Sequence, residues 1–332
     1  MGSIQFIHKY DDIISVENLL EAWDEFVVGK RGRKDVQMFQ LHLMDNILDL
    51  HLDLKNKTYV HRGYEAFTIS DPKPRDIHKA SVRDRILHRA LYIKLYPFFD
   101  RTFISDSFSC RFGKGAHKAL ERFTKFHRKV SKNNTKTTWV LKCDVRKFFA
   151  SIDQGILIKI LDKHIHDKDI IRLLSQIIIS FNSTRIGTGL PLGNLTSQLF
   201  VNIYMNTFDQ FMKHTIKAEY YIRYADDFVI LSVNKQWLED ILASIKIFLS
   251  YELKLSLHPD KISIKTIASG VDYLGWVHFP NHRVLRTATK NRMFRNIKIK
   301  KGRVGTIRSY LGLLKHGNAR KLEKEIKNIY LS

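Results

Sequence analysis

Apolar positions recur at helical spacing in the N-terminal part of the chain. In residues 15–55 they return every three or four positions, which predicts helices. Residues 59–69 are expected to be extended, and Pro72 and Pro74 exclude a helix directly after them. A further helix is predicted from Ser81, a suitable N-cap, because apolar residues follow it at intervals of three and four.

Strand-like and helical patterns alternate in the second half of the chain. The mostly apolar run 139–145 is typical of a buried strand, and the runs 220–224 and 228–233 flank the tripeptide 225–227. These two runs predict a hairpin with two carboxylates at its tip. Further helices are expected over 153–180, about 196–213 and 238–249, a loop over 187–193, and strands over 253–257 and 271–279.

Strands that alternate with helices, yet also pair as hairpins, favour an α+β fold. In such a fold an antiparallel sheet is covered by helices on one face. The 332 residues suffice for one large core or for two or three lobes, and they contain no internal repeat and no low-complexity tract.

The charge of the chain changes this picture most. Its formal net charge is +23 and its pI is about 9.9, which favours partners that are polyanions, either nucleic acid or an anionic membrane. A non-catalytic RNA-binding protein remains an alternative at this point. Residues 281–332 hold 15 Lys or Arg but only two acids, so we expect a nucleic-acid duplex to lie against them.

The cysteines and the hydropathy pattern bear on location. Cys110 and Cys143 have no metal-ligand spacing, which argues against a secreted disulfide framework and for a reducing cytoplasm. The chain has no long uncharged apolar run typical of a transmembrane helix, and its start lacks the apolar core of a signal peptide. We therefore expect a cytoplasmic protein without a membrane partner.

Three carboxylates stand where strands are expected to end. Asp144 lies near the end of the run 139–145, and Asp226 and Asp227 lie at the hairpin tip. Synthesis of a phosphodiester needs an activated 3′-hydroxyl and a stabilised pyrophosphate, and two carboxylate-bound Mg²⁺ ions roughly 4 Å apart provide both. Because Asp also favours turns for purely structural reasons, the hairpin pair alone does not decide between these interpretations.

The order of motifs around these residues points to one family. Residues 144–149, 190–198 and 224–227 are followed by Lys261 and by the tetrapeptide 273–276. With these motifs, the stretch from about residue 55 to 280 resembles the reverse-transcriptase family. The resemblance implies a right-hand polymerase with fingers, palm and a short, basic, helical thumb. It also implies that an RNA template, a DNA or RNA primer and dNTPs are bound.

The resemblance carries over to individual catalytic residues. It implies that Asp144, Asp226 and Asp227 bind two Mg²⁺ ions, together with the backbone carbonyl of Val145. Lys261 matches a lysine proposed to protonate the leaving pyrophosphate, although an ordinary surface lysine is an equal alternative. The residues that match the primer grip are Tyr273, Leu274 and Gly275, where a glycine lets the backbone approach the primer.

Other residues match positions around the incoming nucleotide. Lys73 and Arg75 match the fingers position that holds the triphosphate, which suits a guanidinium fork, though a solvated basic loop is the alternative. Phe149 matches the aromatic residue that excludes a 2′-hydroxyl and so implies deoxynucleotides. Its alternative is a core position, because one ring of the pair Phe148 and Phe149 must point inward.

The loop 190–198 departs from a common family pattern. Where many relatives have glutamine, this chain has Leu192 before Gly193, and the motif ends in Gln198; all three positions are implied to lie near the nucleotide. This pattern is similar to the reverse transcriptases of diversity-generating retroelements and to neighbouring bacterial enzymes. An apolar side chain gives up a hydrogen bond near the nascent base pair, so we hypothesise lower fidelity.

From these motifs we expect residues 1–138 to form the N-terminal region and fingers. Residues 139–280 form the palm, with a helical insertion at about 154–185, and residues 281–332 the thumb. We expect neither an RNase H nor an endonuclease module. One role is to copy an RNA encoded nearby in a diversity-generating retroelement, with a small basic accessory protein or a second reverse transcriptase as partner. Alternatives are antiviral defence, in which a non-coding RNA is copied, and an inactive RNA scaffold.

Overall fold

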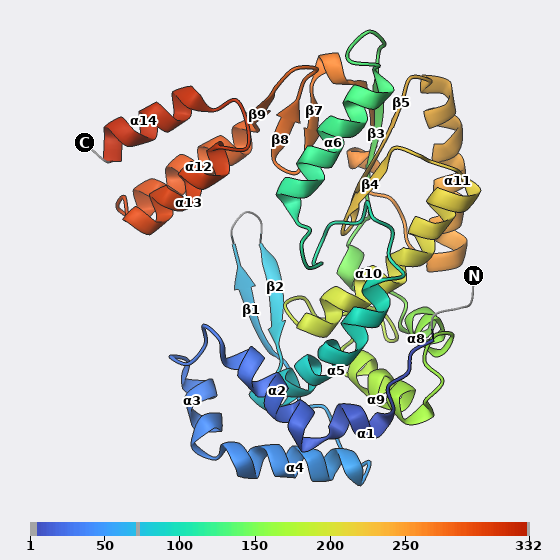
Figure 1. Ribbon diagram of the computed structural model, residues 1–332, viewed down its shortest axis with the longest axis vertical. Helices are drawn as coiled ribbons and strands as arrows, with labels where there is room; N and C mark the ends of the chain where they lie inside the picture. The colour runs from blue at the N-terminus through green and yellow to red at the C-terminus, as the bar shows by residue number, and fades with distance from the viewer. Residues whose placement is uncertain (1–4, 71–73, 331–332) are drawn as a thin grey trace. The chain divides into compact units, whose positions relative to one another are not determined.

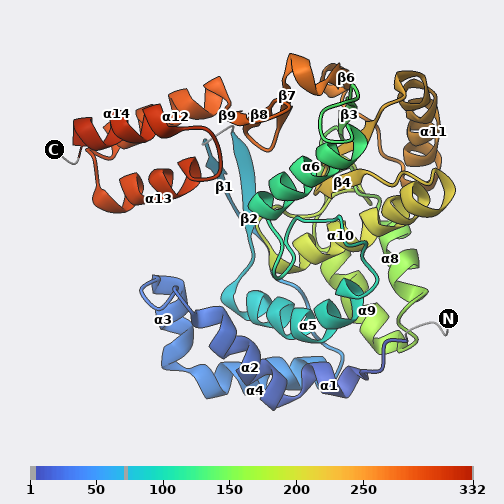
Figure 2. The same cartoon turned by 45° about the horizontal axis from the view of Figure 1, so that its top comes forward.

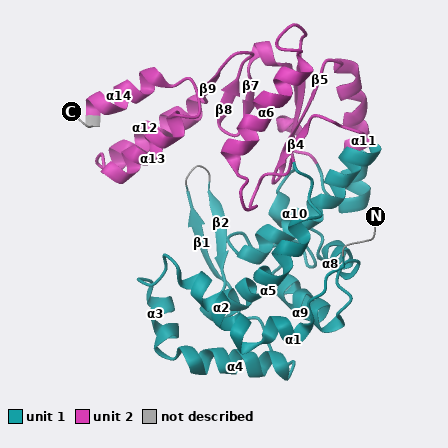
Figure 3. Cartoon of the chain, viewed as in Figure 1, with its two compact units in different colours: residues 1–105, 145–215, 246–256 teal, residues 106–144, 216–245, 257–332 magenta. Residues whose placement is uncertain are grey.

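The chain divides into two units, each assembled from segments that are far apart in the sequence (Figure 3). In this computed structural model, which describes residues 5–70 and 74–330, unit 1 comprises residues 1–105, 145–215 and 246–256. Unit 2 comprises residues 106–144, 216–245 and 257–332. The long helix α11, Lys235–Leu253, begins in unit 2 and ends in unit 1.

Unit 1 is mostly helical, and helix α5 (Val82–Asp100) lies at its centre (Figures 1 and 2). Ser81 caps this helix by accepting a hydrogen bond from the backbone N–H of Asp84. Helix α5 packs against α2 and α10 and buries most of its length. The other helices are α1 (Tyr10–Ile14), α2 (Val16–Val27), α3 (Lys34–Leu41), α4 (Leu43–Lys55), α7 (Phe148–Ser151), α8 (Gln154–Asp162), α9 (Lys168–Ile179) and α10 (Leu195–Gln210), which continues as a π-helical turn, Phe211–Thr215.

A β-hairpin extends from the helices of unit 1. Its strands are β1 (Glu65–Ile69) and β2 (Arg75–Lys79), which pair antiparallel. The base of β2 is joined to the loop before α10, because the backbone N–H of His78 donates to the carbonyl of Leu192 at 3.0 Å. Gly193 permits this approach, since a Cβ there would lie 2.7 Å from Cγ2 of Ile77.

Unit 2 is built on two antiparallel sheets. The first has the strand order β4-β5-β3-β6, and the second has the order β7-β8-β9. Helix α6 (Ala116–Val130) packs against β4 and β5. The strands are β3 (Trp139–Asp144), β4 (Tyr221–Tyr224), β5 (Asp227–Ser232), β6 (Ser263–Thr266), β7 (Val271–Tyr273), β8 (Trp276–His278) and β9 (Arg283–Leu285).

One hydrophobic cluster joins α6, both sheets and the C-terminal helices of unit 2. It includes Phe123 from α6, Val140 from β3 and Val229 from β5, all almost fully buried. Because alternate residues of a strand share a face, Val140 and Val229 lie on the same faces of their strands as Asp144 and Asp227. The C-terminal helices are α12 (Thr287–Ile299), α13 (Val304–Leu314) and α14 (Arg320–Tyr330).

The turn between α13 and α14 is anchored on the second sheet. The backbone N–H of Asn318 donates to the carbonyl of Arg283 at 2.8 Å, and Nε of Arg283 donates to the carbonyl of His316. Gly317 lies directly on the buried ring of Trp276, so that a Cβ there would lie 2.7 Å from Cε3 and still closer to Cζ3.

Most of the expected elements are confirmed, and two are wrong. Residues 253–257, all of which the structure describes, form no strand beyond a single bridge position at Leu257. Helix α11 ends at Leu253, and the backbone N–H of Leu255 bonds back to the carbonyl of Leu249, which is a helix-terminating bond. The expected strand 271–279 is two strands, β7 and β8, separated by a turn at Leu274 and Gly275.

The α+β prediction with antiparallel sheets is confirmed. Within residues 5–70 and 74–330, no helix is long and apolar enough to cross a membrane. The two cysteines are both free thiols, with Cys143 buried in β3 and Cys110 exposed.

The contact of Gly317 with Trp276 predicts a matched pair of substitutions. Gly317→Ala should lower the free energy of unfolding by about 1–3 kcal/mol, because the new methyl group overlaps a buried ring. Gly312→Ala, in the exposed middle of α13 with no atom within 4 Å of the new Cβ, should raise it by up to about 1 kcal/mol. Urea unfolding of both variants measures the difference. Equal effects would contradict the anchoring role of Gly317.

Candidate active site

The three aspartates predicted from the sequence lie together in unit 2. Asp144 is the last residue of β3 and Asp227 is the first residue of β5, and the antiparallel register pairs them directly. Side chains at such opposed positions have Cβ atoms typically about 5 Å apart. Asp226 precedes Asp227 in the turn of the β4–β5 hairpin, so all three carboxylates are held by one sheet.

The hairpin turn that carries Asp226 is strained and clamped. Tyr224 pairs with Asp227, and the φ angle of Ala225 between them is +54°, a conformation that favours glycine. The fully buried Arg223 holds this turn, because its Nη1 donates to the carbonyl of Ala225 at 3.1 Å. Its Nη2 donates to Oγ of Ser107 at 3.1 Å.

Two lysines neutralise part of the carboxylate charge. Nζ of Lys261 lies 2.7 Å from Oδ1 of Asp144, so the structure brings this predicted residue to the site. Nζ of Lys142 lies 3.8 Å from Oδ2 of Asp227 and donates to the carbonyl of Asp272 at 2.8 Å. Lys142 was not predicted, although its position two residues before Asp144 on one strand places both side chains on the same face.

Asp227 is the most perturbed of the carboxylates. Its pKa is raised from 3.8 to about 7, mainly by burial; Lys142 opposes this rise, and the negative charges of Asp144, Asp226 and Asp272 add to it. Its Oδ1 is buried and has no hydrogen-bond partner among the residues that the structure describes. A buried, unsatisfied carboxylate oxygen is costly unless a cation or a donor reaches it.

The chemistry of this donor set fits a divalent cation. Clustered carboxylate oxygens are the ligands that Mg²⁺ and similar hard cations prefer. In the described part of the chain, however, no group of three or more His, Cys, Asp or Glu side chains is arranged to hold a metal ion. Oδ1 of Asp144 is paired with Nζ of Lys261, so a cation at this oxygen competes with the ammonium group.

The residues predicted as the primer grip form the β7–β8 turn of the same unit. Tyr273 pairs with Trp276, and Leu274 and Gly275 between them have φ angles of +48° and +84°. A two-residue turn with both φ angles positive matches the twist of a tight hairpin. Asp272, at the centre of β7, forms an ion pair with Arg286, and its charge contributes to the raised pKa of Asp227.

The candidate nucleotide residues belong to unit 1. Arg75 is exposed at the start of β2, the strand whose His78 is hydrogen-bonded to Leu192, and Gly193 follows in the same loop. Gln198 lies partly buried in the first turn of α10. Lys73 falls outside the described residues.

The pair Phe148 and Phe149 divides as expected, with one ring inward. Phe148 is buried, whereas Phe149 is partly exposed, and the ring centroids are 5.7 Å apart. The carbonyl of Phe149 accepts a hydrogen bond from the N–H of Leu190 at 2.9 Å, which joins it to the loop that carries Leu192. Val145 is buried at the start of the same segment.

One protein-family model matches a long continuous stretch of the chain that includes these motifs. Residues 70–278 match the family described as "Reverse transcriptase (RNA-dependent DNA polymerase)". This stretch is more than half of the chain, and it contains the three aspartates, both lysines and the β7–β8 turn. Reverse transcriptase domains generally use divalent metal ions, in agreement with the donor set at the site.

Curated relatives include two bacterial proteins. Protein YkfC of Escherichia coli is 27% identical over 258 residues, covering 67% of this chain and 66% of that protein. The group II intron-encoded protein LtrA of Lactococcus lactis is 23% identical over 312 residues, covering 72% of this chain and 50% of LtrA. The chain thus spans between half and about two thirds of the length of these two relatives.

A solved structure shares the fold. Telomerase from Candida albicans, in complex with a fragment of telomeric RNA, aligns with a TM-score of 0.51 at 12% identity, covering 70% of this chain and 48% of that one. At this identity the likeness concerns the fold alone, and it confirms the right-hand polymerase class. With its carboxylates at the ends of β3 and β5 and a family match over residues 70–278, the chain belongs to the reverse transcriptase (RNA-dependent DNA polymerase) family.

Proposed function

We propose that this chain is an RNA-directed DNA polymerase that makes cDNA from a dedicated RNA encoded nearby. The observation that carries the proposal is the direct pairing of Asp144 with Asp227, next to Asp226 and within reach of Lys261. This arrangement places three carboxylates at the end of one sheet, as nucleotidyl transfer requires.

In this proposal Asp144, Asp226 and Asp227, with the carbonyl of Val145, hold two Mg²⁺ ions. The ions supply activation of the 3′-hydroxyl and stabilisation of the leaving pyrophosphate. The positive charge of Lys142 lowers the pKa of Asp227 and so favours the ionised carboxylate at neutral pH. Lys261, once released from Asp144, is a proton donor for the leaving group.

In this proposal the residues matched to the family's nucleotide positions supply the nucleotide contacts. Lys73 and Arg75 bind the triphosphate, and Leu192, Gly193 and Gln198 lie near the nascent base pair. The partly exposed ring of Phe149 excludes a 2′-hydroxyl by bulk, while buried Phe148 fixes the backbone. Tyr273, Leu274 and Gly275 position the primer end.

The same proposal divides the chain by function. Residues 1–138 act as the N-terminal region and fingers, residues 139–280 as the palm with its insertion at about 154–185, and residues 281–332 as the thumb. The net charge of +13 over residues 281–332 supports this last assignment, since a duplex backbone is polyanionic.

For the biological role we propose mutagenic copying in a diversity-generating retroelement, in the cytoplasm, with a small basic accessory protein or a second reverse transcriptase as partner. Leu192 and Gln198 carry this assignment. Antiviral defence is the second candidate, because the catalytic motifs are shared by both. A template repeat and a variable repeat beside the gene would favour the retroelement, and a defence-gene neighbourhood without them would favour the alternative.

Substitution of Asp226 tests the catalytic assignment. Asp226→Asn should lower primer extension with Mg²⁺ and dNTPs at least about a thousandfold, because it removes a charge that the reaction uses in the transition state. RNA binding, measured in parallel, should stay unchanged. Asp240→Asn, in the exposed first turns of α11, is the matched control and should retain activity. Full activity of Asp226→Asn would refute the assignment, and no extension by the wild-type protein would favour the inactive scaffold.

The raised pKa of Asp227 predicts a pH dependence of stability in metal-free buffer. Between its ordinary pKa of 3.8 and about 7 the folded state binds more protons than the unfolded state, so the free energy of unfolding should fall as pH rises through this window. Asp227→Asn should flatten that fall. Urea unfolding from pH 4.5 to pH 8 measures it, with Asp240→Asn as control.

Mg²⁺ should act differently on the stability of the wild type and of Asp227→Asn. At pH 8, added Mg²⁺ should stabilise the wild type more than Asp227→Asn, because the ionised carboxylate gains a ligand partner. Parallel pH curves for wild type and Asp227→Asn would contradict the burial of this carboxylate.

Leu192 offers a test of the fidelity hypothesis. Leu192→Gln should lower the misincorporation rate, because an amide restores a hydrogen-bonding group near the base pair. The loop should stay in place, since its anchor is the backbone carbonyl of residue 192 on His78. Ile186→Gln, at a loop position that is 94% exposed, is the control. Sequencing of the cDNA gives the error spectrum, and an unchanged spectrum would reject the hypothesis.

A further inference from the structure

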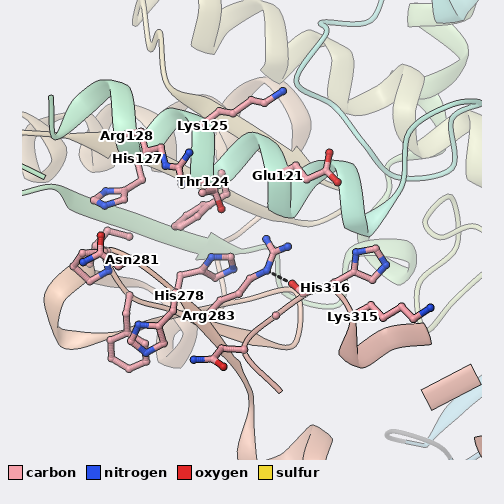
Figure 4. Close-up of a pocket in the computed structure, with 17 residues that line it drawn as sticks. Glu121, Thr124, Lys125, His127, Arg128, His278, Asn281, Arg283, Lys315 and His316 are labelled. Carbon is pink, nitrogen blue, oxygen red and sulfur yellow. Dashed lines mark hydrogen bonds between the residues drawn. The ribbon is translucent and has the colours of Figure 1, made fainter. Parts of the chain in front are cut away.

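A pocket of about 740 Å³ lies within unit 2, apart from the carboxylates (Figure 4). Its walls are one side of α6, the turn between β8 and β9, and the turn between α13 and α14. None of its lining residues belongs to the catalytic or nucleotide sets described above. Its volume is in the range of pockets that bind small organic ligands.

The charge of the lining is strongly one-sided. Four basic side chains face one acidic side chain, Glu121. The basic residues come from all three walls, and they are Lys125 and Arg128 of α6, Arg283 of β9, and Lys315. An excess of cationic side chains around one pocket favours an anionic ligand, and phosphate is the anion that guanidinium groups match best.

Arg283 is held in place for such a contact. Its Nε donates to the carbonyl of His316, and its guanidinium lies 5.9 Å from the ring centroid of Trp276. Figure 4 shows the terminal nitrogens directed toward α6, between Thr124 and Glu121. Burial lowers the pKa of Arg283 because the charged guanidinium has lost water contacts. A bound anion replaces those contacts and stabilises the charge.

The opposite wall offers flat rings and amides. The rings of Phe279 and His282 are stacked, with centroids 5.0 Å apart and an interplanar angle of 16°. Asn281 and Asn318 add amide groups to the lining. His278 is 97% buried, and its Nε2 has no hydrogen-bond partner among the described residues. Stacking surfaces beside hydrogen-bonding edges are the means by which proteins hold unpaired bases.

We propose that this pocket binds a nucleoside phosphate, with the phosphate on the cluster of Lys125, Arg128, Arg283 and Lys315 and the base against Phe279 and His282. Inorganic phosphate alone leaves the stacked wall and most of the volume unused. The same chemistry can be supplied by a free nucleotide or by an unpaired nucleotide of a bound RNA. The proposal does not depend on catalysis by the aspartates.

Binding is tested with the four ribonucleoside 5′-monophosphates in buffer with EDTA, which removes metal-dependent binding at the carboxylates. Lys125→Gln combined with Arg128→Gln should weaken binding about tenfold or more, because each loses a charge-assisted contact. The matched control is Lys118→Gln combined with Lys129→Gln, which removes the same charge from the same helix outside this pocket and should change affinity less than about twofold.

A second variant separates base from phosphate. His282→Ala should weaken the monophosphates while leaving the weaker binding of inorganic phosphate unchanged, since the lost ring contacts only the base. All these positions are at the surface, and circular dichroism checks that each variant is folded.

The source of the nucleotide is resolved by crosslinking. A single-stranded RNA that contains 4-thiouridine should crosslink to residues 279–283 or to α6 if an RNA nucleotide is the ligand, and monophosphates should compete. Monophosphate binding without such a crosslink identifies a free nucleotide. The absence of both, or equal losses in the pocket and control variants, overturns the proposal. Primer extension is measured separately, and its failure in the wild type would refute the proposed function but not this pocket.

Discussion

The antiparallel pairing of β3 with β5 is the constraint on which the candidate site depends. It places Asp144 opposite Asp227, two charges that repel each other, and the pairing must therefore be held by other contacts. Those contacts lie further along the same strand faces, where Val140 pairs with Leu231 inside the hydrophobic cluster. A slip of one residue between the strands would place Asp144 and Asp227 on opposite faces and expose the apolar side chains of one strand, so the core fixes the register of the site.

Bringing these carboxylates together raises the free energy of their charged forms. Asp227 has a pKa near neutrality because it is buried among other acids, and Lys142 offsets only part of that effect. The turn before it adds backbone strain at Ala225, which buried Arg223 holds through the carbonyl of that residue. Site and scaffold are therefore coupled: the β4–β5 turn stays in a strained shape because a guanidinium inside the unit is satisfied by it.

The sequence indicates the aspartates, Lys261 and the β7–β8 residues because their order along the chain is itself informative. The sequence does not predict the roles of Lys142 and Arg223, because these roles depend on which strands pair with each other. A charged residue in an apolar run does not reveal that pairing. The turn at Leu274 was hidden because leucine rarely adopts a positive φ. The prediction of a strand at 253–257 was wrong because alternating leucines do not indicate a strand alone. They are also buried where a helix ends in a tight C-terminal turn, as α11 does here.

The β7–β8–β9 sheet carries both the turn near the aspartates and one wall of the pocket. At one end of the sheet, the Leu274–Gly275 turn lies close in sequence to Asp272, whose negative charge raises the pKa of Asp227. At the other end, His278 lines the pocket. Trp276 and His278 are two residues apart on β8, roughly 7 Å along the strand. Gly317 fixes the turn before α14 on Trp276. Arg283 of β9 pairs with His278 of β8, and β8 pairs in turn with β7, so one three-stranded sheet carries both the β7–β8 turn and a wall of the pocket.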